Sequence, residues 1–129
     1  MVRRALGASL LIAATGCNNP LSPGRDVILP VSEIAAPAVL APGEELTVGV
    51  TVALVTSCFS FERFDAERTT GRVTLRAIGR EKLGLACADV ITEETHDYRV
   101  QQPLAFPFVI VVLGADGIGQ QRVVNARAP

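Results

Sequence analysis

Residues 46–54 alternate between large apolar and small or polar side chains, and this pattern limits the fold more than any other feature of the chain. Leucine and valine occupy every even position from Leu46 to Leu54, whereas threonine, glycine and alanine occupy the odd positions. A period of two puts all the large apolar side chains on one face of an extended strand. Pro42 and Gly43 predict a turn just before this run. The pattern therefore predicts a half-buried β-strand.

Six other segments carry strand-like patterns between turn signals, so the predicted domain is all-β. These segments cover residues 27–34, 58–64, 73–77, 97–101, 106–113 and 118–125. The first contains Pro30, which an edge strand tolerates, and residues 106–113 are apolar on both faces, as in a central strand. Asp116 and Gly117 form a hairpin signal between the last two segments. About seven strands in roughly one hundred residues predict an antiparallel two-layer β-sandwich.

The number and spacing of these strands resemble the immunoglobulin-like and fibronectin type III-like class of β-sandwiches. The resemblance covers roughly residues 26–127, and we interpret residues 26–129 as a single folded domain. Tryptophan is absent, so the chain lacks the buried tryptophan that packs beside the disulfide of true immunoglobulin domains. The resemblance implies an architecture and does not identify a function.

The first seventeen residues have the three parts of an export signal. Arg3 and Arg4 supply positive charge, residues 5–14 form an apolar run, and small residues precede Cys17. The run is too short to cross a bilayer as a permanent helix. We therefore interpret residues 1–16 as a signal peptide.

The segment Ala14-Thr15-Gly16-Cys17 resembles the lipobox of bacterial lipoprotein signal peptides, although leucine is more usual at the first of these positions. The resemblance implies that Cys17 is acylated and becomes the first mature residue, followed by a turn-rich tether over residues 17–25. The lipid would hold the protein in the bacterial envelope, on the periplasmic side of the outer membrane or at the cell surface. Two alternatives stay open: a secretory signal cut near Gly16 that leaves the cysteine unmodified, and a short buried helix of a cytosolic domain.

Besides Cys17, the chain has two cysteines, Cys58 and Cys87. Exported domains usually pair such cysteines, so we predict a disulfide between them. The bridge would close a loop of about 30 residues and stabilise the fold by roughly 3–4 kcal/mol. The irregular stretch 81–95 is then mostly a loop held by this bridge. The alternative is two reduced, buried thiols.

Composition excludes several classes of partner. Without residues 1–16 the chain keeps ten basic and thirteen acidic residues, so neither nucleic acid nor an anionic lipid surface is indicated. Tyr98 is the only tyrosine and tryptophan is missing, which disfavours surfaces that stack on sugars. A protein partner and the membrane reached through the lipid at Cys17 are the expected contacts.

No constellation of residues in the sequence indicates catalysis or metal binding. His96 is the only histidine, and two cysteines beyond Cys17 are too few for a thiolate cage. His96 lies near Glu94 and Asp97, but adjacent residues on a strand point to opposite faces, and we interpret this segment as a solvated polar loop. Asp116 lacks the further aspartates of a calcium loop. We expect no catalytic residue, no metal, no cofactor and no small-molecule substrate.

Arginines recur at every fourth position from Arg68 to Arg80. Nearby threonines and glycines argue against a helix, and on a strand Arg72 and Arg76 would share the face opposite Val73. We therefore take Arg72 and Arg76 as a candidate partner surface. The alternative is that they only solvate the outer face of a sheet.

Together these features predict a lipid-anchored cell-envelope protein whose non-catalytic β-sandwich acts as a protein-interaction or structural module. The alternative function is a periplasmic inhibitor of a secreted enzyme such as lysozyme or a protease. An exposed loop with a reactive group at residues 62–70 would favour the inhibitor. An enzyme is disfavoured because the sequence lacks a recognisable nucleophile and base.

Overall fold

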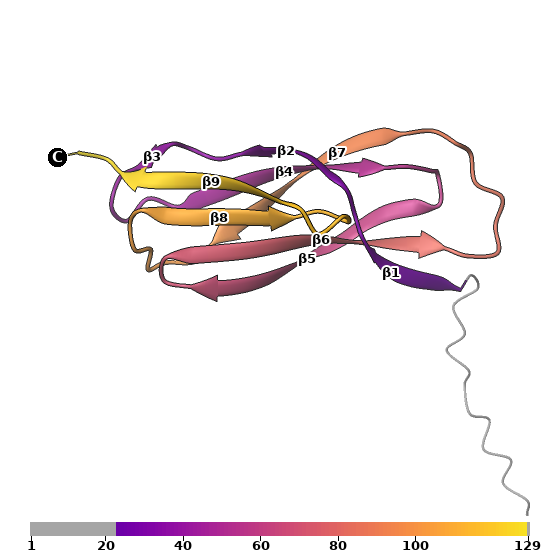
Figure 1. Cartoon of the computed structure of the whole chain (residues 1–129), viewed down its shortest axis with the longest axis horizontal. Helices are drawn as coiled ribbons and strands as arrows, with labels where there is room; N and C mark the ends of the chain where they lie inside the picture. Colours follow the sequence, from indigo (N-terminus) through magenta and orange to yellow (C-terminus); the bar gives the residue numbers. More distant parts are fainter. Residues whose placement is uncertain (1–22, 129) are drawn as a thin grey trace, which may run out of the picture.

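The computed structural model describes residues 23–128, which form two β-sheets packed face to face (Figure 1). These residues contain no helix, and the predicted all-β sandwich is confirmed. Their nine strands are β1 (Gly24–Ile28), β2 (Val31–Ala35), β3 (Val39–Leu40), β4 (Leu46–Leu54), β5 (Phe59–Thr69), β6 (Arg72–Lys82), β7 (Thr92–Val100), β8 (Phe108–Leu113) and β9 (Gly119–Ala126). The predicted signal peptide, residues 1–16, and the predicted lipidation site, Cys17, lie outside the described residues. The predicted tether ended at residue 25, whereas β1 already begins at Gly24.

The smaller sheet has the order β2-β4-β7, with β4 at its centre. This strand has the bounds that the alternating pattern predicted. Leu46, Val48, Val50 and Val52 are fully buried, while the residues between them are half-buried. The alternation places one face of β4 against the core and leaves the other face at the surface of the sheet.

The larger sheet is built around β6. Strand β5 pairs along the whole of one edge of β6, and the other edge is shared by β8 along residues 72–76 and by β1 along residues 78–82. Strand β9 follows next to β8, and the short β3 pairs with β9. Figure 1 shows this sheet in front of the smaller one.

Two strand pairs are parallel, namely β6 with β8 and β3 with β9, where the sequence had predicted antiparallel pairing throughout. After β6 the chain crosses to the smaller sheet as β7 and then returns, so β8 runs in the same direction as β6. Immunoglobulin domains consist of two antiparallel sheets, and the central β6–β8 pair departs from that arrangement. The described residues also have nine strands where about seven were expected.

The segment 27–34, predicted as one edge strand, is divided between the two sheets. Strand β1 pairs with β6 of the larger sheet, and β2 pairs with β4 of the smaller one. Leu29 and Pro30 make the crossing, and Leu29 is fully buried between the sheets. Opposite this crossing only glycine fits at position 79, because a Cβ there would lie 2.7 Å from the carbonyl oxygen of Ser60.

Strand β7 is longer than predicted, since it begins at Thr92 and not at residue 97. It pairs with β4 along nine residues at the edge of the smaller sheet. Its added residues, 92–96, are polar and mostly exposed, so they lack the apolar alternation that identifies a strand. The loop predicted for residues 81–95 is therefore confined to residues 83–91.

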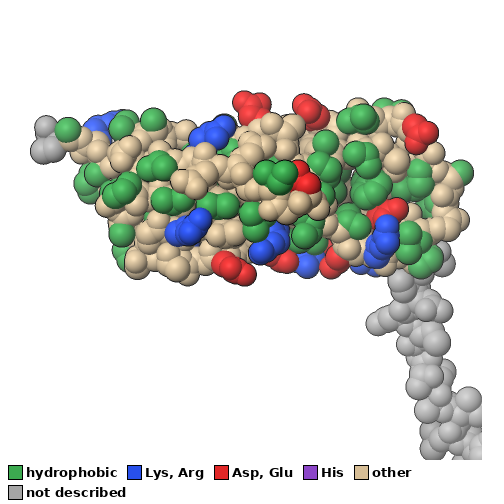
Figure 2. Space-filling view, in the orientation of Figure 1, with side chains coloured by type: hydrophobic (Ala, Val, Ile, Leu, Met, Phe, Trp, Pro, Cys, Tyr) green, Lys and Arg blue, Asp and Glu red, His purple; other side chains and the backbone are tan. Residues whose placement is uncertain are grey.

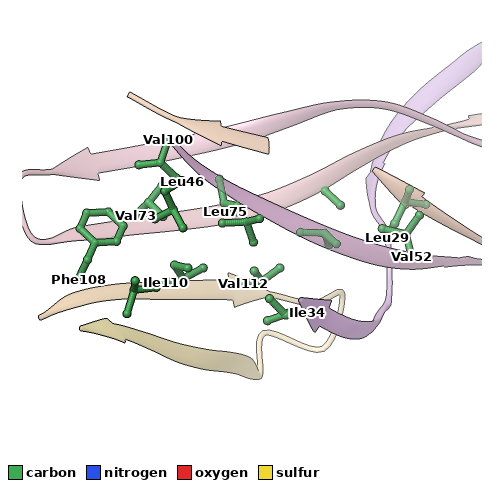
Figure 3. Close-up of a cluster of buried hydrophobic side chains, with 14 of the residues drawn as sticks. Leu29, Ile34, Leu46, Val52, Val73, Leu75, Val100, Phe108, Ile110 and Val112 are labelled. Atoms are coloured by element: carbon green, nitrogen blue, oxygen red, sulfur yellow. The ribbon is translucent and has the colours of Figure 1, made fainter. Parts of the chain in front are cut away.

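The core contains aliphatic side chains from both sheets and one phenylalanine, Phe108. In Figure 3, Phe108, Ile110 and Val112 project from β8 toward Leu46 and Val100 of the smaller sheet. All five side chains are buried. No buried polar or charged residue occurs among residues 23–128, so the interior is held together mainly by apolar burial.

Candidate interaction surfaces

Arg72 and Arg76 lie on the outer face of the larger sheet. They alternate along β6 with Val73 and Leu75, whose side chains are fully buried in the core. Arg76 has a carboxylate neighbour, since its Nη1 lies 3.7 Å from Oε1 of Glu67. Arg72 is exposed and forms no ion pair with any residue from 23 to 128. Arg72 is thus the less neutralised cation of the two.

The arginines on this face adjoin apolar side chains of β8 and β9. Arg72 is in register with Val109, and Arg76 with Leu113. Val109 is in turn in register with Val123, which is 43% exposed. Figure 2 shows this side of the molecule, on which hydrophobic and charged side chains are intermixed. We call the side chains of Arg72, Arg76, Val109, Leu113 and Val123 the outer face.

Arg63 on β5 illustrates how a neutralised arginine differs from Arg72. Its guanidinium forms ion pairs with Asp26, Glu62 and Asp65. Desolvation acts to lower the pKa of Arg63, but hydrogen bonds and charges from Asp65 and then Asp26 raise it above its ordinary value. The acidic and basic groups of this region therefore pair with one another. This favours a solvated surface over a binding site.

Arg68 does not belong to the outer face, although it starts the four-residue repeat of arginines. Its Nη2 donates hydrogen bonds of 2.8 Å to the carbonyl oxygens of Gln101 and Pro103. The guanidinium carbon lies 4.8 Å from the centre of the Phe108 ring. Arg68 therefore ties β5 to the connection between β7 and β8, and its role is structural.

His96 lies on β7 and not in the solvated loop that the sequence had suggested. Its ring stacks on Phe61 of β5 with the ring centres 3.8 Å apart, and Nε2 lies 2.9 Å from Oε2 of Glu94. Glu94 and His96 are two positions apart and so share one face of the strand, whereas Asp97 points to the other. The sequence interpretation was wrong because pairing with β4 holds this polar segment in a strand.

An aromatic cluster joins β5 and β7, the edge strands of the two sheets. Phe61 contacts Phe64 at 5.0 Å between ring centres, and Phe64 contacts Tyr98 at 5.7 Å. A shift in register between Phe61 and Arg63 lets both phenylalanines point inward, although three positions separate them. The sequence carried no signal for this bulge. The cluster closes one side of the sandwich and leaves His96 partly exposed at its rim.

Cys58 and Cys87 form the predicted disulfide, with 5.5 Å between their Cα atoms. The bridge joins the start of β5 to the loop 83–91. Two hydrogen bonds reinforce it, from the amide of Ser57 to the carbonyl oxygen of Ala88 and from the amide of Ala88 to the hydroxyl of Ser57. The loop is therefore fixed to the sandwich at its middle.

Residues 62–70, where an exposed reactive loop would have favoured an inhibitor, mostly belong to a strand. Residues 62–69 lie in β5, paired with β6. This feature therefore gives no support to the inhibitor.

The described residues include two open hollows, and neither is lined by Arg72, Arg76 or His96. One of about 250 Å³ lies between Pro30 and the hairpin that joins β8 to β9. Another of about 360 Å³ lies beside Arg99 and Gln102. Over residues 23–128, no three His, Cys, Asp or Glu side chains come together as a metal site would need. Within the same range there is no helix with the length and hydropathy to cross a membrane.

The fold brings some of the candidate residues together and separates others. Arg72 and Arg76 share the outer face with apolar residues, and Cys58 and Cys87 are joined, while His96 is separate from both. Comparison of the chain with protein-family models, with curated proteins and with solved structures gave no match.

Proposed function

We propose that this chain is a lipid-anchored protein of the bacterial cell envelope whose β-sandwich acts by protein contact or as a structural module, without catalysis. The observation that carries the contact role is the outer face of the larger sheet. There an exposed arginine without an ion pair in the described part of the chain, Arg72, adjoins partly exposed valines. Arginine is enriched at protein interfaces relative to the rest of the surface.

The anchoring role is supported by the order of features along the sequence. Positive charge, an apolar run and small residues lead to Cys17, and only five residues separate Cys17 from Pro23, where the described domain begins. Asn18, Asn19 and Pro20 are turn-forming residues that do not continue a helix. A short tether of this kind suits a domain held close to a membrane.

Replacing Cys17 with serine is expected to release the protein from membranes. Two acyl chains together with an acylated terminus anchor a protein stably, whereas a single chain is marginal. Detergent phase separation of the wild-type and Cys17→Ser proteins measures the change, with mass spectrometry of the N-terminal peptide. A wild-type protein that partitions into the aqueous phase, with an unmodified terminus, would contradict lipid anchoring.

Reversing the charges of Arg72 and Arg76 to glutamate is expected to reduce the capture of an envelope partner about tenfold at low salt, because opposite charges steer association. Crosslinking and pull-down from the membrane-anchored protein measure this capture. Arg72→Glu and Arg99→Glu provide a matched pair, since each changes one exposed arginine and they lie on opposite sheets. Equal capture by both single variants would remove the outer face from consideration.

A further inference from the structure

The loop 83–91 exposes apolar side chains at one end of the sandwich. They are Leu83, Leu85, Val90 and Ile91, and Ile91 is 71% and Leu85 55% exposed. Val55, on the neighbouring connection between β4 and β5, is also exposed. The only charged residue of the loop is Asp89. We call residues 83–91 the apolar loop.

The disulfide holds the apolar loop in a defined place. Cys87 lies in the middle of the loop, and the hydrogen bonds between Ser57 and Ala88 flank the bridge. These links fix the middle of the loop beside the start of β5. Large exposed apolar patches on proteins mark sites of contact with other proteins or with membranes.

The start of the described chain lies next to the apolar loop. The amide of Leu83 donates a hydrogen bond of 2.8 Å to the carbonyl oxygen of Pro23, and Gly24 pairs with Lys82. Figure 1 shows the start of β1 and the connection from β6 to β7 at the same end, with the C-terminus at the other end. Figure 2 shows hydrophobic side chains at the surface of this end.

The position of Cys17 in the sequence limits how far this end can be from a bilayer. Cys17 precedes Pro23 by six positions. A fully extended chain of that length spans at most about 20 Å. A lipid on Cys17 would therefore keep the apolar loop within reach of the membrane surface, while the C-terminal end of the sandwich is farther away.

We propose that the apolar loop docks into the interfacial region of the bilayer that anchors Cys17, as a second membrane contact. This inference rests on the proposed lipid anchor, which sets the orientation. The contact is hydrophobic, because the loop carries a single charge and the chain as a whole is slightly acidic. Partial insertion of leucine, valine and isoleucine side chains adds apolar burial to the two acyl chains and aligns the sandwich on the membrane.

Tryptophan fluorescence tests this contact directly, because the chain contains no tryptophan. The mature chain with Leu85→Trp is coupled through its free Cys17 thiol to a maleimide lipid in vesicles of phosphatidylethanolamine and phosphatidylglycerol. This coupling makes the measurement independent of whether cells acylate Cys17. Ile91→Trp is a second reporter from the same loop. Val39→Trp is the control, since Val39 is 45% exposed and belongs to β3 near the opposite end.

The tryptophans at positions 85 and 91 should shift their emission to shorter wavelengths and lose most of their intensity to brominated acyl chains, whereas the tryptophan at position 39 should do neither. Adding Ile91→Ser to the Leu85→Trp chain should weaken the quenching. Unchanged emission at positions 85 and 91, or equal quenching at position 39, overturns the inference. Mass spectrometry of Cys17 from cells decides the proposed anchor separately, so the two failures are distinguishable.

Discussion

Replacing Phe108 with alanine is expected to lower the free energy of unfolding by about 3–5 kcal/mol, the range measured for buried aromatic residues. Phe108 is fully buried and is the first residue of β8. Its ring lies among Val73, Ile110 and Leu46 (Figure 3). The same ring supports the guanidinium of Arg68. Alanine would leave a cavity and would also remove the contact between the ring and the Arg68 guanidinium.

Denaturant unfolding followed by circular dichroism measures this loss for Phe108→Ala. Ile118→Ala is the control, because Ile118 is 70% exposed on the hairpin between β8 and β9 and its removal should change stability by less than about 0.5 kcal/mol. A loss below about 1 kcal/mol for Phe108→Ala would mean that the site collapses or that the ring is not in the core.

Removing the disulfide with Cys58→Ala and Cys87→Ala together is expected to lower the free energy of unfolding by roughly 3–4 kcal/mol. The bridge joins residues 29 positions apart and so restricts the unfolded chain over a long loop. It also links the apolar loop to the start of β5. The folded sandwich should persist, because neither cysteine contributes to the aliphatic core cluster.

Thermal and denaturant unfolding of the double variant measure this contribution, and reduction of the wild-type protein should produce a similar shift. Cys17→Ser should unfold like the wild type, since position 17 precedes the described domain. Free-thiol labelling of unfolded, unreduced wild-type protein checks the bridge itself. Full labelling of Cys58 and Cys87 would be incompatible with the disulfide.

The local residue pattern was sufficient to predict strands in which one face meets the core and the other meets solvent. The bounds of β4 follow from its alternation, and the turn at Asp116 and Gly117 follows from residues that favour it, with Gly117 at a φ of 78°. The disulfide was predicted from the cysteine count together with the predicted export signal. Arg72 and Arg76 were placed on one face because strand geometry alone decides which side chains share it.

Other parts of the fold have no local signal. Residues 92–96 of β7 are polar and mostly exposed, so only their pairing with β4 makes them part of the strand. The apolar loop became recognisable as a surface only once its side chains were seen to be exposed beside Pro23. The proposed lipid anchor at Cys17, in contrast, rests on the sequence alone.

The sequence by itself determined the all-β architecture, the pairing of Cys58 with Cys87 and the alternation that sets which face of each regular strand is buried, because these depend on residue types at short spacing. The tertiary structure decided the division of residues 27–34 between two sheets, the parallel pairing of β6 with β8, and the inward position of Arg68. Each of these depends on contacts between segments far apart in the chain. These contacts are stabilised by burial and hydrogen bonding between distant segments, which no local sequence pattern predicts.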